Sequence, residues 1–282
     1  MNAVSNPGAL AGPAGGTGDK HAIARGFGGA SGSYDAASRL QKAMGDRLLT
    51  CLPDTAGPAH ILDLGCGTGW FTRHLARRYP ESTITGADLA PGMLHHARGR
   101  GPEHIRWLNA DAEHLPLASN STDLIFSNLM IQWSTRPELI LNECRRILRP
   151  GGTLAISTLL DGTLAELRQA WAHADPGQPH VNQFATTGDW QRVTRQCLPG
   201  STLDTHTLIL PYASPISLNR ELKQLGAVFR GKERRRTITA PGRFKAMCAA
   251  YPGGENGQVF ASYHAGWLYW TKPRHIATLH QR

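Results

Sequence analysis

Long hydrophobic runs are missing from this sequence. No stretch approaches the roughly 18 consecutive apolar residues that a membrane-spanning helix needs, so an integral membrane protein is excluded. The first 20 residues also lack the basic start and the apolar segment of a signal peptide, and they are rich in glycine, alanine and proline. We therefore expect residues 1–25 to form a flexible tail.

Cysteine and acidic residues are both scarce. The five cysteines lie far apart and form neither a CxxC pair nor a Cys/His cluster with zinc spacing, so we expect no metal site and a cytoplasmic protein. Only 21 Asp and Glu stand against 30 Lys and Arg, which gives a formal net charge of +9. A charge of this sign attracts nucleic acid, anionic lipid or an acidic protein, and the charge alone does not choose among them.

Composition and hydrophobic pattern indicate a globular α/β protein. The 282 residues are 40% hydrophobic and 18% charged. A chain of this length and composition can fold around a single hydrophobic core. Short apolar runs alternate with helical patterns that begin near Trp70, Pro91 and Arg136. The apolar runs are 61–64, 83–87, 105–109, 124–127 and 153–157. This alternation predicts βαβ units, that is, a mostly parallel sheet with helices on both faces.

The segments on either side of this region complete the expected domain. Apolar residues three or four apart predict a leading helix over 34–48. Later patterns predict helices over 163–174, 188–197, 217–226 and 241–251, and strands over 202–210 and 259–270. We expect these strands to complete a seven-stranded sheet and the late helices to pack over its carboxyl edge, where open α/β sheets bind ligands. Residues 26–282 would form one domain, with a cofactor half at about 59–158 and substrate-side elements at about 26–50 and 159–255.

Three glycines at alternate positions follow the first predicted strand, in the run Ile-Leu-Asp-Leu-Gly-Cys-Gly-Thr-Gly that ends at Gly69. Glycine lets the backbone turn tightly and approach a ligand without Cβ collisions, so Gly65, Gly67 and Gly69 are candidate cofactor contacts. A dinucleotide-binding turn would need its third glycine at the position of Trp70. The turn instead resembles the DxGxGxG motif of class I S-adenosylmethionine (AdoMet) methyltransferases.

Other residues of the cofactor half occur in an order that fits the same class. We expect Asp63 to brace the turn and contact the cofactor, and Cys66 to be a small packing residue in the loop rather than a nucleophile. Asp88 ends the second strand, where a carboxylate can accept both ribose hydroxyls. The resemblance implies that Asp111 and the backbone of Ala112 lie at the adenine edge. The remaining candidate cofactor contacts are Cys66, as part of the loop, Leu89 and Asn128.

Motifs outside the glycine turn resemble a narrower family. They are Ser-Tyr-Asp-Ala-Ala at 33–37, Leu-Gln at 40–41, Ser-Asn-Leu-Met-Ile-Gln-Trp at 127–133, Gly-Thr-Leu-Ala-Glu-Leu at 162–167, His-Val-Asn-Gln-Phe at 180–184 and Leu-Lys-Gln-Leu-Gly-Ala at 222–227. Together they are similar to the malonyl-[acyl-carrier protein] O-methyltransferases of biotin synthesis, over about residues 25–271. The resemblance implies methylation of the free carboxyl of a malonyl thioester on acyl carrier protein, which lets fatty-acid synthesis extend the ester as an ordinary primer.

The implied acceptor decides what chemistry the protein must perform. A carboxylate with a reference pKa of about 4 is already ionised at neutral pH, so displacement at the sulfonium methyl needs no general base. Catalysis then reduces to positioning and desolvation. The candidate positioning groups are Tyr34, Gln132, Trp133 and an arginine from the late helices. Each named residue could also have a structural role: a core aromatic for Tyr34, a hydrogen-bonded loop amide for Gln132 and a pocket wall for Trp133.

A basic run lies within residues 230–245. Its cations are Arg230, Lys232, Arg234, Arg235, Arg236, Arg243 and Lys245. Acyl carrier proteins are acidic as a class, so we expect this run to dock the carrier rather than to be merely a solvated charged loop. We expect no membrane or nucleic-acid partner, because residues 127–130 lack the Asn/Asp-Pro-Pro-aromatic signature and the basic run has few aromatic residues. A small-carboxylate or quinone-precursor methyltransferase is a rival assignment, and so is a partner protein without turnover.

Overall fold

The structure, a computed structural model, describes residues 17–52, 57–227, 240–254 and 257–274. Its elements are α1 (Thr17–Ala37), α2 (Arg39–Thr50), β1 (His60–Leu64), α3 (Trp70–Arg78), β2 (Thr83–Asp88), α4 (Pro91–Arg98), β3 (Arg106–Asn109), β4 (Thr122–Asn128), η1 (Ile131–Trp133), α5 (Pro137–Ile147), β5 (Leu148–Leu159), α6 (Ala165–Ala174), α7 (Thr187–Cys197), β6 (Thr202–Tyr212), α8 (Pro215–Gln224), α9 (Pro241–Ala250) and β7 (Val259–Thr271). Within these ranges, no helix is long and apolar enough to cross a membrane.

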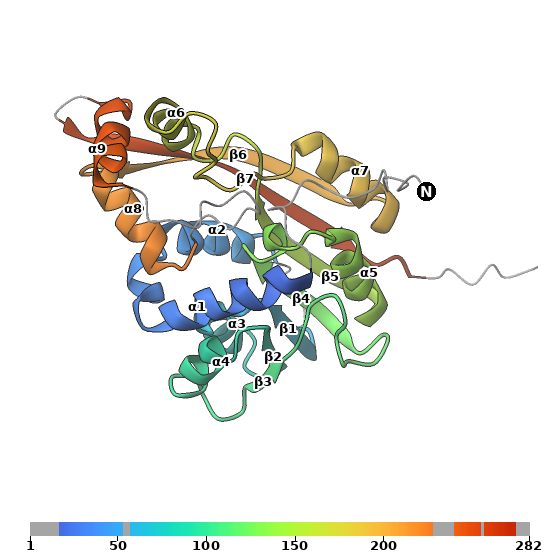
Figure 1. The fold of residues 1–282 in the computed structure, drawn as a ribbon. Coiled ribbons are helices and arrows are strands. Elements are labelled where there is room, and N and C mark those ends of the chain that lie inside the picture. Colours follow the sequence, from blue (N-terminus) through green and yellow to red (C-terminus); the bar gives the residue numbers. More distant parts are fainter. Residues whose placement is uncertain (1–16, 53–56, 228–239, 255–256, 275–282) are drawn as a thin grey trace, which may run out of the picture.

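The strands form one sheet in the order β3-β2-β1-β4-β5-β7-β6 (Figure 1). Adjacent strands in the run β3-β2-β1-β4-β5 are parallel to each other, and β7 runs antiparallel to both β5 and β6. The carboxyl ends of β1 to β4 therefore meet at one edge, with the change of winding direction between β1 and β4. The predicted α/β fold with a mostly parallel seven-stranded sheet is confirmed.

Helices cover both faces of this sheet. Successive residues of a strand point to opposite faces, so Leu124 and Phe126 of β4 pack in one apolar cluster and Ile125 in another. The first cluster includes side chains of α2 and α3, and the second includes side chains of α5 and α7. The central strands are therefore buried on both sides, which leaves their carboxyl ends as the part of the sheet that can meet a ligand.

The leading segment is ordered further towards the N-terminus than the sequence predicts. α1 begins at Thr17, so residues 17–25 are helical and the prediction of a tail up to residue 25 is wrong over this stretch. Glycine-rich sequence is a poor helix former, but Ala24 is buried against Ala90 and Met93 at α4. Tertiary packing of this kind supplies most helix stability in proteins and overrides the local preference.

Two other predicted helices also differ. The helix expected over 34–48 is divided between α1 and α2 at Ser38, whose hydroxyl donates to the carbonyl oxygen of Asp35 at 3.1 Å and so competes with helical bonding. The expectation that late helices pack over the carboxyl edge is wrong for α7. Its Trp190 lies in the same apolar cluster as Ile140 of α5, so α7 covers a face of the sheet.

Candidate active site

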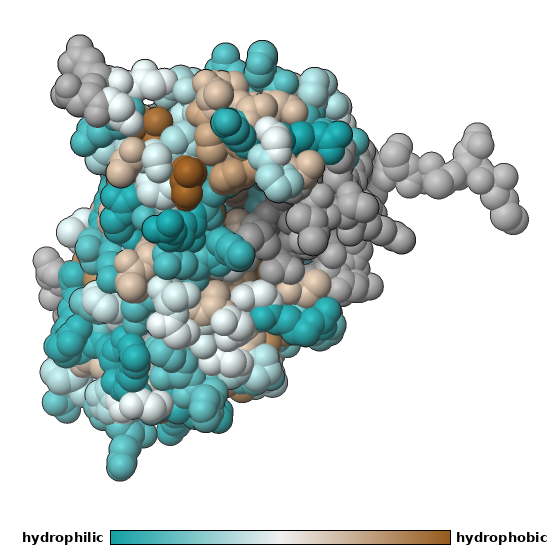
Figure 2. Space-filling model, turned by 60° about the vertical axis from the view of Figure 1, so that its left-hand side comes forward, coloured by the Kyte–Doolittle hydropathy of each residue, from teal (hydrophilic) through white to brown (hydrophobic). Residues whose placement is uncertain are grey.

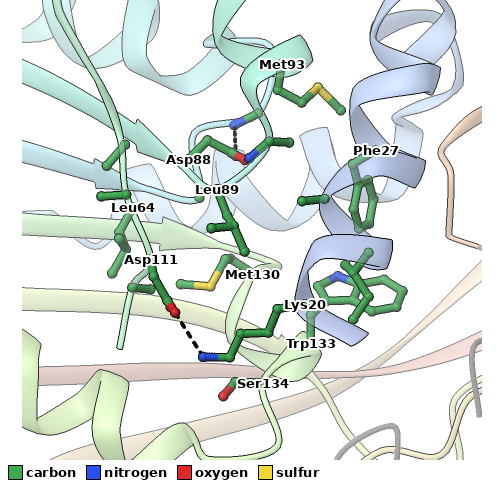
Figure 3. A pocket seen from close by; sticks show the side chains of 18 of the residues that line it. Lys20, Phe27, Leu64, Asp88, Leu89, Met93, Asp111, Met130, Trp133 and Ser134 are labelled. Carbon is green, nitrogen blue, oxygen red and sulfur yellow. Dashed lines mark hydrogen bonds and ion pairs between the residues drawn. The ribbon is translucent and has the colours of Figure 1, made fainter. Parts of the chain in front are cut away.

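Three cavities among the described residues lie where the strands of the sheet end. The strand-end cavity has a volume of about 140 Å³ and is bordered by Gly65, Asp88, Asp111, Asn128 and residues of α1, among others (Figure 3). The helical cavity, of about 250 Å³, is bordered by Gln132, Leu167 and Trp171 of α6, and Leu222 of α8, among others. The turn hollow, of about 40 Å³, is bordered by Lys42, Asp63, Cys66 and Thr68, among others. Tyr34 of α1 borders all three.

The glycine turn after β1 requires glycine for three different reasons. All three glycines have positive φ, at 75°, 55° and 73° for Gly65, Gly67 and Gly69. A Cβ on Gly65 would lie 2.3 Å from Cγ of Met130, whereas a Cβ on Gly67 would meet no atom within 4 Å. A Cβ on Gly69 would lie 2.5 Å from the ring of Trp107. Gly65 and Gly67 border the strand-end cavity, but Gly69 borders none of the three, so packing explains Gly69 and its predicted cofactor contact is unsupported.

Asp88 connects the end of β2 to this turn. Its Oδ2 accepts the backbone N–H of Gly67 at 2.9 Å, and its Oδ1 accepts that of Ala90 at 2.8 Å. Burial raises the pKa of Asp88, against the lowering effect of these two hydrogen bonds. The carboxylate borders the strand-end cavity beside Leu89 (Figure 3). It can therefore hold the turn in place and present its remaining lone pairs to a diol.

Asp63 lies under the turn and faces the turn hollow. It is 2% exposed, and its Oδ2 accepts the Thr72 hydroxyl at 2.5 Å, so it braces the start of α3 as predicted. Burial, with a further contribution from the charge of Asp88, raises the pKa of Asp63 to about 7. Burial also raises the pKa of the Cys66 thiol well above its usual value, so this cysteine remains a neutral packing group.

The far end of the strand-end cavity is closed by a lysine from α1. Lys20 Nζ lies 3.0 Å from Oδ2 of Asp111 (Figure 3). It also lies 2.6 Å from Oε2 of Glu113. Glu113 is 3% exposed and also accepts hydrogen bonds from Ser134 and Arg136. Burial alone would raise the pKa of Asp111, but the backbone N–H of Glu113 and the Lys20 ammonium lower it. Sequence reasoning missed Lys20 and Glu113, because Lys20 fell in the expected tail.

Aromatic side chains separate the strand-end cavity from the helical cavity. Phe27, Tyr34, Leu129 and Trp133 border both, and the rings of Phe27 and Trp133 meet edge to face with centroids 5.2 Å apart. Burial raises the pKa of Tyr34 above its ordinary value, so its hydroxyl stays protonated. Gln132 borders the helical cavity only, and its Nε2 donates to the Leu129 carbonyl at 2.9 Å. Tyr34 and Trp133 thus lie at the boundary between the two cavities, and Gln132 lies in the helical cavity; the contact of all three with an acceptor stays a prediction.

Two further predictions concern Asn128 and the late arginines. Asn128 borders the strand-end cavity, but its amide braces the structure: Nδ2 donates to the Gln41 carbonyl at 2.9 Å, and Oδ1 accepts the Ser157 hydroxyl at 2.6 Å. Ala112 borders the same cavity, and its contact with adenine stays a prediction. No arginine borders the helical cavity within the described ranges, so the expected arginine is not found there, whereas Lys223 does border it.

The arrangement of sheet and site defines a class of protein. A glycine turn after β1, an acidic residue at the end of β2 and a cavity across the ends of the parallel strands are the features that hold a nucleoside-bearing cofactor. The order of strands, with β7 antiparallel between β5 and β6, completes the architecture. The chain is a class I AdoMet-dependent methyltransferase.

Comparison with known proteins narrows this class. Residues 62–156 match the family model described as a methyltransferase domain. The malonyl-[acyl-carrier protein] O-methyltransferase of Methylococcus capsulatus is 39% identical over 255 residues, which cover 89% of this chain and 92% of that protein. The protein of that name from Serratia marcescens is 39% identical, with 87% and 93% covered. The chain belongs to the malonyl-[acyl-carrier protein] O-methyltransferase family.

Other proteins match this chain either over only part of their own length or in fold with low sequence identity. The chain spans 51% of the biotin biosynthesis bifunctional protein BioHC of Cellvibrio japonicus, with 38% identity. Among solved structures, the YcgJ protein of Bacillus subtilis has a TM-score of 0.56 at 18% identity, covering 82% of this chain and 98% of its own. A Bacillus halodurans protein assigned as a methyltransferase has a TM-score of 0.58 at 16% identity, covering 82% and 100%. These structures show the same fold.

The residues around the strand-end cavity and the turn hollow fit AdoMet. The open space over Gly67 admits a ligand against the backbone, where any larger residue would place a Cβ. Asp88 offers carboxylate oxygens to ribose hydroxyls, and Asp111 offers an acceptor to an exocyclic amine. Asp63 and Lys42 border the turn hollow. The Asp63 carboxylate can pair with the amino group of AdoMet, and the Lys42 ammonium can pair with its carboxylate.

We expect AdoMet affinity to rise with pH between about 6 and 8. Because the folded-state pKa of Asp63 is raised to about 7, Asp63 is largely neutral at pH 6 and ionised at pH 8, when it attracts a cationic ligand. The same shift makes the native state hold this proton to higher pH than the unfolded chain does, so the contribution of Asp63 to stability falls as pH rises from about 4 through 7.

Calorimetric titration of AdoMet at pH 6, 7 and 8 measures this dependence. In Asp63→Asn, whose side-chain oxygen can still accept from Thr72, the dependence should flatten. An equally steep rise in the Asn variant would assign the titration to another group.

Proposed function

We propose that this protein transfers the methyl group of AdoMet to the free carboxyl of malonyl-acyl carrier protein and forms its methyl ester, early in biotin synthesis. The observation that carries the proposal is the shared aromatic boundary between the strand-end cavity and the helical cavity. An acceptor that enters the helical cavity can reach the cofactor at this boundary. The same assignment is supported by the relatives from Methylococcus capsulatus and Serratia marcescens, which are named malonyl-[acyl-carrier protein] O-methyltransferase and match this chain along most of their length.

The residues of the site suit methylation of a carboxylate. AdoMet, when bound, supplies a methyl group on a positively charged sulfur. The acceptor carboxylate is ionised at neutral pH, so no protein group has to remove a proton. Phe27, Leu129 and Trp133 exclude water at the boundary, which strips the carboxylate of hydration and favours its attack. The neutral Tyr34 hydroxyl can donate a hydrogen bond there but is a poor base.

The helical cavity has the character expected for a thioester-borne acyl group. Its walls are mainly apolar and aromatic, with Trp171 stacked on the His180 ring at a centroid distance of 3.9 Å. Nε2 of His180 in turn lies 2.9 Å from Oδ2 of Asp175. These apolar and aromatic walls can enclose a short acyl chain.

The carrier itself needs a surface near the cavity. Of the predicted docking run at 230–245, Arg230, Lys232, Arg234, Arg235 and Arg236 lie outside the described residues, whereas Arg243 and Lys245 on α9 are described. Two more exposed cations are on α8, Arg220 and Lys223, and Lys223 borders the helical cavity. The proposed docking face therefore extends from α9 onto α8.

The exposed face of α8 combines charge with one apolar side chain. Ile216, Arg220 and Lys223 are spaced by four and three residues, so they share a helix face, and Ile216 is 49% exposed. Figure 2 shows this side of the molecule as mostly hydrophilic, with isolated hydrophobic residues. A cationic face of this kind favours encounter with an acidic carrier.

Charge reversal on this face should weaken recognition of the carrier. We expect Arg220→Glu with Lys245→Glu to raise KM for malonyl-acyl carrier protein roughly tenfold and to leave small malonyl thioesters unaffected. The effect should shrink in salt, because the Debye length falls from about 10 Å at 0.1 M to about 3 Å at 1 M. Arg77→Glu with Arg98→Glu, on exposed positions of α3 and α4, makes the same change in net charge and is the matched control. Equal losses on carrier-bound and small thioesters would rule out docking on this face.

The function is tested by methyl transfer from radiolabelled AdoMet. Malonyl-acyl carrier protein should be the best acceptor, ahead of malonyl-coenzyme A and free malonate, and RNA should not be labelled. Preferred labelling of free malonate or of another small carboxylate would assign the chain to small-molecule methylation instead. The proposal places the reaction in the cytoplasm, in line with five scattered cysteines that are all free thiols.

A further inference from the structure

One side chain outside the predicted site lies between two of the cavities. Gln41 of α2 borders both the turn hollow and the helical cavity, and the only other described residue common to these two is Tyr34. The turn hollow adjoins the glycine turn, whereas the helical cavity is where the acceptor enters. Gln41 is therefore placed where the cofactor's amino acid end and the acceptor approach each other.

The amide of Gln41 has no partner within the described part of the chain. The buried atom of this amide is Oε1, which accepts no hydrogen bond. Two other amides around the helical cavity differ in that their nitrogens are engaged: Asn219 donates to the Pro215 carbonyl, and Gln132, whose Oε1 is also unpaired, donates to the Leu129 carbonyl. A buried amide left unpaired costs free energy, so its presence calls for a ligand that pairs with it.

The backbone of Gln41 is nevertheless held firmly. Its carbonyl accepts Nδ2 of Asn128 at 2.9 Å, and Asn128 is in turn bonded to Ser157, which ties α2 to the ends of β4 and β5. The neighbouring Leu40 and Met44 are buried in the core. A side chain on such a fixed backbone can present its amide at a defined place while the amide itself remains free to turn.

We propose that the Gln41 amide, with the Tyr34 hydroxyl, binds the carboxylate of the acceptor and orients one of its oxygens towards the methyl group; this rests on the function proposed above. A carboxylate needs hydrogen-bond donors, and a 180° rotation of the Gln41 amide exchanges the unpaired Oε1 for Nε2, which supplies two N–H groups. Because the amide is uncharged, it holds the carboxylate without neutralising the electron density that attacks the methyl carbon. Gln132 is less suited to this task, since its Nε2 is already bonded to the Leu129 carbonyl.

Two substitutions at Gln41 test the assignment by steady-state kinetics with malonyl-acyl carrier protein. Gln41→Met removes the donor at similar size and should lower kcat/KM by about 10- to 100-fold, the range for a hydrogen bond to a charged group. Gln41→Glu should lower it further at pH 8, because two carboxylates then face each other. In Gln41→Met, the loss of kcat/KM should exceed any loss of AdoMet affinity. Gln191→Glu, on an exposed position of α7, is the control for the added charge.

The pH dependence of Gln41→Glu distinguishes contact from a structural role. The introduced carboxyl, its pKa raised by the neighbouring carboxylate, becomes a donor when protonated, so activity should recover as pH falls from 8 towards about 5.5. Wild-type activity should show no such rise. Full kcat/KM of Gln41→Glu at pH 8, or a loss that follows AdoMet affinity instead, would overturn the proposal. A wild-type protein that does not methylate malonyl thioesters at all would instead refute the proposed function, and with it the acceptor assigned to Gln41.

Discussion

Gly67→Val should abolish measurable AdoMet binding while the protein still folds. At φ 55°, an L-residue costs roughly 1–2 kcal/mol, and β-branching adds strain. A Cβ at this position meets no protein atom within 4 Å, so the fold has room for it. The open space over Gly67 is, however, the place where we expect the cofactor to meet the turn. We expect an affinity loss of more than about a hundredfold, which corresponds to at least about 2.7 kcal/mol.

A second glycine separates backbone strain from blockage of the site. Gly200, between α7 and β6, also has a positive φ, 80°, and a Cβ there likewise meets nothing within 4 Å. It borders none of the three cavities. Gly200→Val should therefore lower Tm by a similar amount and leave AdoMet affinity, measured by calorimetry, unchanged. If Gly67→Val bound AdoMet as Gly200→Val does, the turn would not be a cofactor contact.

The structure of the cofactor half could be predicted from sequence because the patterns that indicate it are local in the chain. The alternation of apolar runs with helical patterns located the parallel strands. The turn needs positive φ at alternate positions, which glycine adopts most easily, so its glycines could be recognised in the sequence. Asp88 could be placed because residues at the carboxyl ends of adjacent parallel strands must meet. Gly69 shows the limit of this reasoning. A glycine is needed at this position because a Cβ would collide with the Trp107 ring. The motif alone does not distinguish a glycine needed for packing from one that contacts a ligand.

Residues supplied by the leading helices could not be placed in the same way. Lys20 lies in a glycine-rich segment with weak helix propensity, and its helix is formed through packing against α4 and ion pairs with Asp111 and Glu113. Gln41 is a polar residue on an amphipathic helix, a position that normally faces water. Only the tertiary structure, which ties its backbone to Asn128, shows that this side chain borders two cavities and that its Oε1 is buried.

Asp88→Ala should weaken AdoMet binding by roughly a hundred- to a thousandfold. Loss of a hydrogen bond from the ribose to a charged oxygen accounts for about 1.5–3 kcal/mol. The remainder follows from the turn itself, because the carboxylate also accepts the backbone N–H groups of Gly67 and Ala90 at 2.9 and 2.8 Å. Without this acceptor, the turn loses the group that fixes it to the end of β2. Asp88→Asn keeps one oxygen and should fall between the wild type and Asp88→Ala.

Asp123→Ala is the matched control, since Asp123 also braces backbone but at the opposite edge of the sheet. Its Oδ2 accepts the His60 N–H at 2.8 Å, and its carboxylate pairs with Arg149. Both Asp→Ala variants should lose thermal stability, because each removes a carboxylate that holds backbone in place. Only Asp88→Ala should lose AdoMet affinity in calorimetric titration. If the two variants lost affinity equally, the effect would come from general loosening of the sheet, and Asp88 would have no direct part in binding the cofactor.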